Sequence, residues 1–279
     1  LAPVSGGLSG ARCQIPNHVQ SDPHPKACAL SVDVLPRPPG LMPYLLAQIV
    51  FGLLAMTICL PSMQEWGEIF STDATHVQLT FSAFVIAYGV SQVIYGPLSD
   101  RYGRRPVVLV GLVIALTGSL GAVLSPDIDS LIVARAVQGL GCGATMVVGR
   151  SLVQDFFAGP ERTRVMAFIG MTMGVCPPLA TVIGGQLHVY LGWQANPALV
   201  CVLGVLLFFL AMRMLPTGSR SAVGDAHWAV SMIQAYRALA RLRVYLLHVA
   251  ILGASTGAFY TYLAAAPLVL RGYGVGPDG

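Results

Sequence analysis

The sequence predicts an all-α integral membrane protein. Of its 279 residues, 55% are hydrophobic and only 10% are charged, whereas a soluble domain carries about 25% charged residues. The mean hydropathy is +0.70, and the apolar residues gather in runs of about 20 residues, each long enough to cross an apolar core of about 30 Å as a helix. The net charge of +4 is too sparsely distributed to form a nucleic-acid-binding face.

Seven apolar runs follow one another along the chain and are expected to span the bilayer: 41–63, 77–98, 106–124, 131–153, 165–187, 196–214 and 246–270. Residues 1–40 are rich in Pro, Gly and Ser without hydrophobic period, so a disordered tail is expected. Residues 215–245 are expected to link spans 6 and 7. Their apolar residues recur near the helical period beside Arg237, Arg241 and Arg243, which favours a helix on the membrane surface over a flexible linker.

The charges in the connections predict the orientation. The links after spans 2, 4 and 6, counted together with Arg213 at the end of span 6, contain ten Arg residues, and those after spans 1, 3 and 5 contain no Arg or Lys but several Asp and Glu. By the positive-inside rule the N-terminal tail and the Arg-rich links are expected in the cytoplasm. Residues 271–279 would then lie outside, on the opposite side of the membrane.

The six cysteines show no metal-ligand spacing. Four of them, Cys59, Cys142, Cys176 and Cys201, lie inside or beside apolar runs, so small buried hydrophobic residues are expected rather than ligands or disulfides. No metal site or cofactor is expected.

A dense group of charges lies between spans 2 and 3, where residues 95–110 read YGPLSDRYGRRPVVLV. The link is so short that the two helices must form a tight antiparallel hairpin. Gly96 and Gly103 remove side chains where backbones approach or turn, and Pro106 suits a first helical turn. On charge alone, Arg101 and its neighbours are sufficiently explained as topology anchors at the lipid headgroups.

The spacing of residues 96–105 adds a second interpretation. They resemble the G-x-L-x-D-R-x-G-R-R signature of the major facilitator superfamily at every defining position. The resemblance implies a charge relay that holds the outward-open state, formed by Asp100, Arg104 and Asp155, with Arg101 and Arg105 beside them. It also implies a fold of two six-helix bundles around a central cavity, of which this chain would be a truncated form: the six-helix N-terminal bundle, 41–214, and the first helix of the second.

Span 4 contains RAVQGLGCGA at 135–144, which is similar to the R-x-x-Q-G-x-G motif of proton-coupled drug exporters. The resemblance makes Arg135 and Gln138 candidates for proton coupling or for the cavity, with Gly139, Gly141 and Gly143 packing against neighbouring helices. An Arg inside an apolar helix is costly unless it faces protein or water. The alternative is that it snorkels to the outer headgroups.

Span 5 resembles the antiporter motif, in which small residues and Pro allow close packing and a bend. The match is imperfect, because Thr181 stands where Pro is expected and Pro177-Pro178 lie upstream. A glycine-rich packing face explains the segment nearly as well. The candidate packing glycines are Gly170, Gly174, Gly184 and Gly185.

Within the superfamily the chain resembles the bicyclomycin-resistance (Bcr/CflA) branch of bacterial drug:proton antiporters, through QLTFSAFVIAYGVSQVIYGPLSDRYGRRPVVL, LIVARAVQGLGCGA, GRSLVQDFF and GAFYTYLAAAPLVL. It departs from that branch at Thr57, where an Asp is usual, and at Gln154, where an Arg is usual. No Asp or Glu lies inside any of the seven apolar runs. Proton coupling would therefore need Arg135 and the acids at helix ends, or a carboxylate elsewhere, or would be absent.

Two functions from different classes follow. The first is an efflux transporter that exchanges small amphiphilic drugs for protons by alternating access. The second is a non-transporting or half-transporter membrane protein that needs a partner bundle or dimer. No nucleophile, metal or phosphate-loop motif suggests an enzyme. Candidate substrate-lining residues, each also explained by packing, are Tyr44, Gln48, Met56, Phe84, Tyr88 and Gln92.

Overall fold

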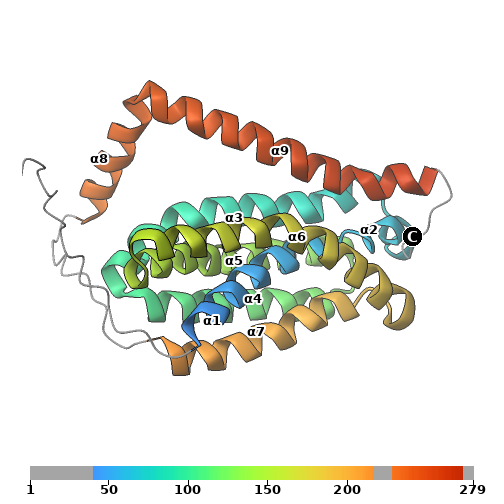
Figure 1. Cartoon of the computed structure of the whole chain (residues 1–279). Coiled ribbons are helices and arrows are strands. Elements are labelled where there is room, and N and C mark those ends of the chain that lie inside the picture. Colours follow the sequence, from blue (N-terminus) through green and yellow to red (C-terminus); the bar gives the residue numbers. More distant parts are fainter. Residues whose placement is uncertain (1–39, 216–227, 273–279) are drawn as a thin grey trace, which may run out of the picture. The chain divides into compact units, whose positions relative to one another are not determined.

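The computed structural model describes residues 40–215 and 228–272, and all regular elements in these ranges are helices. The predicted tail lies outside them except for Gly40, as do residues 273–279. Along the chain the helices are α1 (Leu41–Thr57), α2 (Met63–Ile69), α3 (Ala74–Tyr102), α4 (Arg104–Val123), α5 (Ile128–Phe156), α6 (Gly159–Leu191), α7 (Ala195–Met214), α8 (Trp228–Arg241) and α9 (Arg243–Gly272) (Figure 1).

Six helices in the described ranges are long and apolar enough to cross a membrane: α3, α4, α5, α6, α7 and, in α9, the stretch Arg243–Tyr262. The predicted spans 2 to 7 fall on these six helices. The all-α membrane class predicted from the sequence is therefore confirmed.

The first span differs from its prediction at its C-terminal end. The apolar run continues to residue 63, but α1 ends at Thr57 after 17 residues, about 26 Å at 1.5 Å per residue. A buried turn follows, in which Leu60 N donates to Thr57 O and Met63 N to Cys59 O, before α2 begins. The predicted boundary was wrong because hydropathy does not detect a turn whose own residues are apolar.

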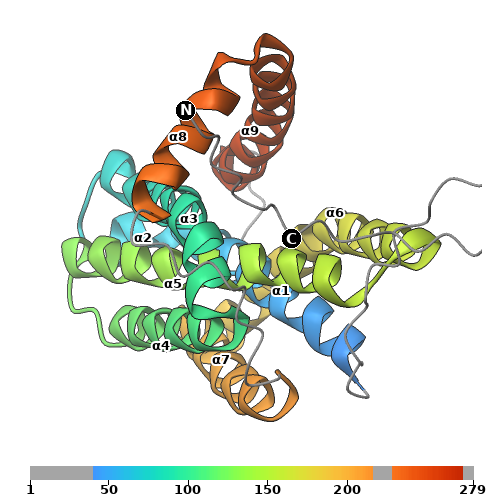
Figure 2. The same ribbon diagram turned by 90° about the vertical axis from the view of Figure 1, so that its left-hand side faces the viewer.

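Helix α5 is the centre of the bundle and contacts α3, α4 and α1. Figure 2 shows α5 between α3 and α4. Small residues make this possible: a Cβ at Gly141 would clash with the backbone of Ala115 and Gly111, and one at Gly139 with the carbonyl of Phe84. The helices therefore approach backbone to backbone, as is common where membrane helices pack.

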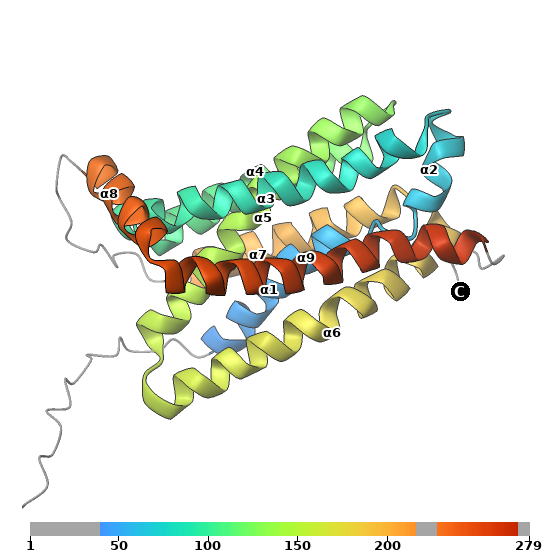
Figure 3. The same ribbon diagram turned by 90° about the horizontal axis from the view of Figure 1, so that it is seen from above.

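Helix α1 packs against α5, α6 and α7, and Figure 3 shows it between α3 and α6. A Cβ at Gly184 of α6 would clash with the carbonyl of Ile58, in the turn after α1. Helix α6 is continuous through Pro177 and Pro178. The end of α1 and the C-terminal part of α6 are thus fixed against each other.

A helix, α8, lies within the predicted linker 215–245. Its Tyr236 hydroxyl donates to the Val93 carbonyl of α3 at 3.0 Å, and its apolar side chains Ile233 and Leu239 are exposed. Location of α8 at the membrane surface stays a prediction.

The cysteines in the described residues are free thiols. Cys59, Cys142 and Cys176 are buried and Cys201 is half-buried, as expected for small apolar residues. Cys13 and Cys28 lie outside the described residues.

Candidate functional site

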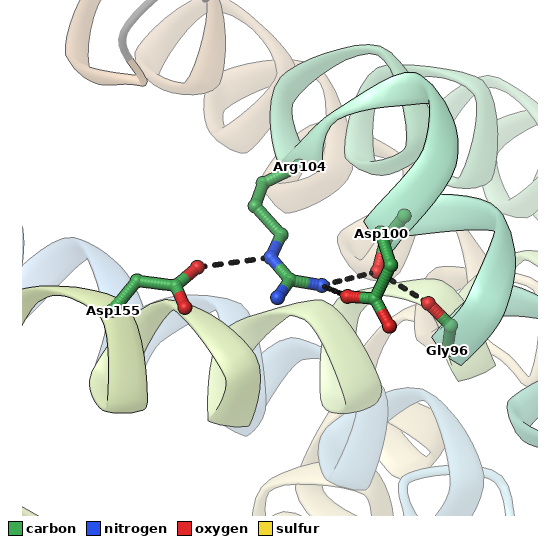
Figure 4. Close-up of polar contacts among 5 residues, drawn as sticks. Gly96, Asp100, Arg104 and Asp155 are labelled. Atoms are coloured by element: carbon green, nitrogen blue, oxygen red, sulfur yellow. Dashed lines mark hydrogen bonds and ion pairs between the residues drawn. The ribbon is translucent and has the colours of Figure 1, made fainter. Parts of the chain in front are cut away.

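Four polar side chains meet where α3, α4 and α5 have their ends, and we call Ser99, Asp100, Arg104 and Asp155 the Arg104 cluster (Figure 4). The Arg104 guanidinium donates from Nε to Asp155 Oδ2 at 3.0 Å and from Nη1 to Asp100 Oδ1 at 2.5 Å. Nη1 also donates to Ser99 Oγ at 2.6 Å. One arginine thus connects carboxylates that lie 55 residues apart on two different helices.

Each charged residue of the Arg104 cluster interacts unfavourably with the dipole of its own helix. Asp100 lies in the last turn of α3 and Asp155 in the last turn of α5, where the helix dipole favours cations; Arg104 opens α4, where it favours anions. Each charge therefore depends on the others for compensation. Because the side chains of Arg104, Asp155 and Asp100 are 15%, 31% and 59% exposed, water screens the pairs, and each is worth only about 0.2–1 kcal/mol.

The other two arginines of the motif make different contacts. Arg105 Nη2 donates to the Met212 carbonyl in the last turn of α7 at 2.7 Å, where a cation also suits the helix dipole. The Arg101 guanidinium lies 5.3 Å from the Tyr102 ring centroid. Asp100, Arg104 and Asp155 are brought together as the resemblance implied, while Arg105 joins α4 to α7.

Arg135 lies inside the bundle rather than at a membrane surface. Its residue is 2% exposed, and Nη1 donates to the Ala55 carbonyl at 2.8 Å and Nη2 to the Met56 carbonyl at 3.3 Å. These carbonyls belong to the last turn of α1, the part of a helix where carbonyls commonly lack helical N–H partners. Arg135 therefore caps the C-terminus of α1, and the snorkelling alternative does not describe this geometry.

The rest of the Arg135 surroundings is neutral. Gln138 Oε1 accepts from Arg135 Nη1 at 2.5 Å, and Gln138 Nε2 donates to Ser119 Oγ of α4 at 2.8 Å. The Phe84 ring lies 4.4 Å from the guanidinium carbon, within cation–π range. Thr57, which stands where the resemblance led us to expect Asp, donates from its hydroxyl to the Leu53 carbonyl at 3.0 Å. The contacts of Arg135 in the described residues are thus carbonyls, an amide and an aromatic face.

The candidate lining residues divide into two groups. Met56 and Tyr88 border a cavity of about 780 Å³ between α3 and α9, together with Phe81, Thr256 and Tyr260. Tyr44, Gln48 and Phe84 are at most 2% exposed and pack inside the bundle, where Gln48 Nε2 donates to the Thr145 carbonyl at 2.9 Å. Gln92 is half-buried outside that cavity.

The candidate packing glycines also divide. Gly139, Gly141, Gly143 and Gly184 face atoms that a Cβ would strike, and Gly185 is buried. Gly103 has φ of +94°, which favours glycine, and ends α3. Gly96 has only ordinary contact with Val147, and no described atom lies within 4 Å of a Cβ at Gly170 or Gly174.

Sequence reasoning missed one buried polar group, at the other end of α6. His188 is 6% exposed, and its Nε2 lies 2.9 Å from Glu65 Oε2 of α2. The two residues are 123 positions apart in the sequence, so no local motif joins them. The only available signal was a lone histidine close to the end of an apolar run.

Comparison with known proteins assigns the family. The model of the Major Facilitator Superfamily matches residues 45–278. The chain belongs to the major facilitator superfamily. The inward-open xylose transporter XylE from E. coli has a similar fold, with a TM-score of 0.60 at 14% identity, covering 83% of this chain and 63% of that one.

Two relatives carry names that refer to drugs. Multidrug resistance protein D of Escherichia coli is 34% identical over 177 residues, 63% of this chain and 45% of that protein. The chloramphenicol resistance protein of Pseudomonas aeruginosa is 27% identical over 226 residues, 80% of this chain and 53% of that protein. The chain spans about half the length of these curated relatives.

Proposed function

We propose that this chain forms the first helical bundle of a transporter that exports small amphiphilic drugs from the cytoplasm in exchange for protons. The family assignment and the names of the relatives support drug efflux. We place it in a bacterial inner membrane with its N-terminus in the cytoplasm, as the distribution of arginines favours. Its role is transport rather than catalysis.

The observation that carries this proposal is the Arg104 cluster. It connects the ends of three helices with pairs of modest strength, which is what a reversible latch requires. If the pairs exist in only one conformation, their loss shifts the equilibrium between inward- and outward-open states by their differential free energy. About 1 kcal/mol changes the population ratio roughly fivefold. The cluster can therefore bias alternating access without preventing it.

The second candidate function, a half-transporter that works only with a partner bundle, is favoured by one observation. Gly170 and Gly174 of α6 are exposed, and no described atom lies within 4 Å of a Cβ built at either position. In an antiporter this face would meet the second bundle. In the first candidate the second bundle belongs to the same transporter chain, whereas in the second candidate a separate partner supplies it.

The test is substitution of Asp100 in a chimaera that joins this chain to the second half of multidrug resistance protein D. Asp100→Asn should reduce efflux of an amphiphilic dye by up to about fivefold with normal membrane insertion, because Arg104 loses one of its carboxylates while the spans are untouched. The matched control is Asp129→Asn, an equally conservative change at an exposed acid in the first turn of α5. Undiminished efflux by Asp100→Asn would show that the cluster is not a latch and serves only as a topology anchor.

A further inference from the structure

A polar cluster lies at the end of the bundle farthest from Arg104, and we call Ser62, Glu65, Trp66, His188 and Asn196 the His188 cluster. His188 is 29 residues beyond the start of α6, about 44 Å along the helix. Asn196, at the start of α7, donates from Nδ2 to Ser62 Oγ at 2.8 Å and to the Gly184 carbonyl at 3.1 Å, one turn before His188. Helices α2, α6 and α7 are thus joined by buried side chains.

Three buried polar atoms of this cluster have no hydrogen-bond partner among the described residues: Trp66 Nε1, His188 Nδ1 and Asn196 Oδ1. Native proteins leave few such atoms, and each needs an explanation. Packing alone supplies none, since an apolar residue would fill the same space without the cost of an unpaired donor or acceptor. A second hydrogen-bonded arrangement of this region would pair these atoms.

Glu65 gives the buried imidazole a route to water. Its side chain is 45% exposed, whereas that of His188 is 5% exposed. Beside a carboxylate, the neutral imidazole carries its proton on Nε2 and donates it to Glu65, which leaves Nδ1 as a bare acceptor. Imidazole is also the side chain best suited to exchange a proton near neutral pH.

The segments near the end of α6 carry few other titratable residues. Helix α2 supplies Glu65 and, one turn later, Glu68; the turn at 58–62 supplies the buried thiol of Cys59; the last turn of α1 and the first turn of α7 supply none. The other described histidine–carboxylate pair, His76 with Asp73, is exposed at the start of α3. Its hydrogen bond lowers the pKa of the Asp73 carboxyl, and both side chains are open to water.

We propose that His188 and Glu65 form the proton-binding site of this chain, by which it takes up the proton exchanged for drug. In the empty site the imidazole is neutral and Glu65 is ionised, so the pair carries one negative charge. One proton from water enters through Glu65 and ends on the imidazole, giving a neutral ion pair with donors at both Nε2 and Nδ1. This inference rests on the proposed drug:proton exchange. It supplies a titratable group for that exchange, which Thr57 does not provide because it stands where an Asp was expected.

The loaded site has a structural consequence. Protonation turns Nδ1 into a buried donor, which is costly without an acceptor. Asn196 Oδ1 is a buried acceptor without a partner, held one helical turn from His188 by the bond of Nδ2 to Gly184 O. Small movements of α6 against α7 that join these two atoms would stabilise the loaded state. Proton uptake thereby acts on α6, which also contacts α1.

Tryptophan fluorescence of the purified full chain in lipid nanodiscs tests proton binding directly. Trp66 directly follows Glu65 in α2, and its ring lies edge-to-face with that of Trp193, with 5.9 Å between the ring centroids. A Trp228→Phe background removes the third tryptophan. Because protonated imidazole quenches indole emission, lowering the pH from about 8 to about 5 should give one sigmoidal decrease. His188→Gln should abolish it, and Glu65→Gln should displace its midpoint by removing the carboxylate that the imidazole faces. His76→Gln is the matched control and should leave it unchanged.

A titration that persists in His188→Gln, or a midpoint that Glu65→Gln leaves in place, would overturn the assignment. Transport in the chimaera then tests coupling. His188→Gln should abolish dye accumulation against a gradient while dye equilibration down its gradient continues; unchanged concentrative transport would also overturn the assignment. If the parent chimaera exports nothing, the proposed function fails, but the fluorescence titration still decides whether this pair binds a proton.

Discussion

At the scale of single residues, Arg135 shows how a charge is kept inside an apolar bundle. Three of its contacts are to oxygen acceptors, the carbonyls of Ala55 and Met56 and the amide of Gln138. None of these is an acid, so the positive charge is delocalised over dipoles rather than neutralised. The side chain both fixes the end of α1 and leaves a cation available in the bundle.

We expect Arg135→Gln to destabilise the chain strongly. The carbonyls of the last α1 turn would lose a charged donor, at about 1–3 kcal/mol for each buried group left unpaired. Thermal unfolding in detergent measures this, with Arg213→Gln, an exposed arginine in the last turn of α7, as the matched control. Equal melting temperatures for the two variants would show that the capping contacts contribute nothing.

Thr57 gives a complementary prediction at the same site. It follows directly after Met56, whose carbonyl accepts from Arg135. A carboxylate introduced by Thr57→Asp would lie close to the guanidinium, and an opposite charge at short range stabilises both ionised groups. We expect raised thermal stability at neutral pH that is lost on acidification, whereas Thr57→Asn should show no such pH dependence. A Thr57→Asp variant with unchanged stability at every pH would contradict this arrangement.

At the scale of helices, the glycines of α5 and α6 have different environments. Gly141 meets backbone of α4, which cannot yield, and Gly170 meets no described atom. We expect Gly141→Ala to prevent accumulation of folded protein and Gly170→Ala to leave folding unchanged. Size-exclusion profiles of the two fluorescently tagged variants measure this. Monodisperse protein from Gly141→Ala at parental yield would show that α4 and α5 do not approach this closely.

How far the sequence predicts these helices depends on what terminates them. The charged link at 99–105 ends α3 and begins α4, so that hairpin is visible in the sequence. The turn after Thr57 is apolar and is determined by contacts with Gly184 and Arg135, which come from distant helices. Likewise, the motif signalled Asp100 and Arg104, but the pairing of Glu65 with His188 arises only when α2 and the end of α6 come together.

At the scale of the whole molecule, the distribution of arginines predicts the topology. Reporter fusions at Ser125, in the link after α4, should behave as periplasmic, and fusions at Gly218, outside the described residues, as cytoplasmic. Paired alkaline phosphatase and green fluorescent protein fusions at each position measure this. The reverse pattern would place the Arg104 cluster on the periplasmic side and contradict its role as a cytoplasmic latch.

The two-bundle mechanism requires that this chain cannot transport without a second bundle. Alternating access needs two bundles that close on a central site from opposite sides, and residues 40–215 supply one. Proton-gradient-driven dye efflux should be measured in membrane vesicles that contain this chain alone, and in vesicles where it is co-produced with the second half of multidrug resistance protein D. We predict no efflux from the chain alone, and efflux that a protonophore abolishes when the second bundle is present. Protonophore-sensitive efflux from the chain alone, or no efflux with the second bundle, would contradict the two-bundle mechanism.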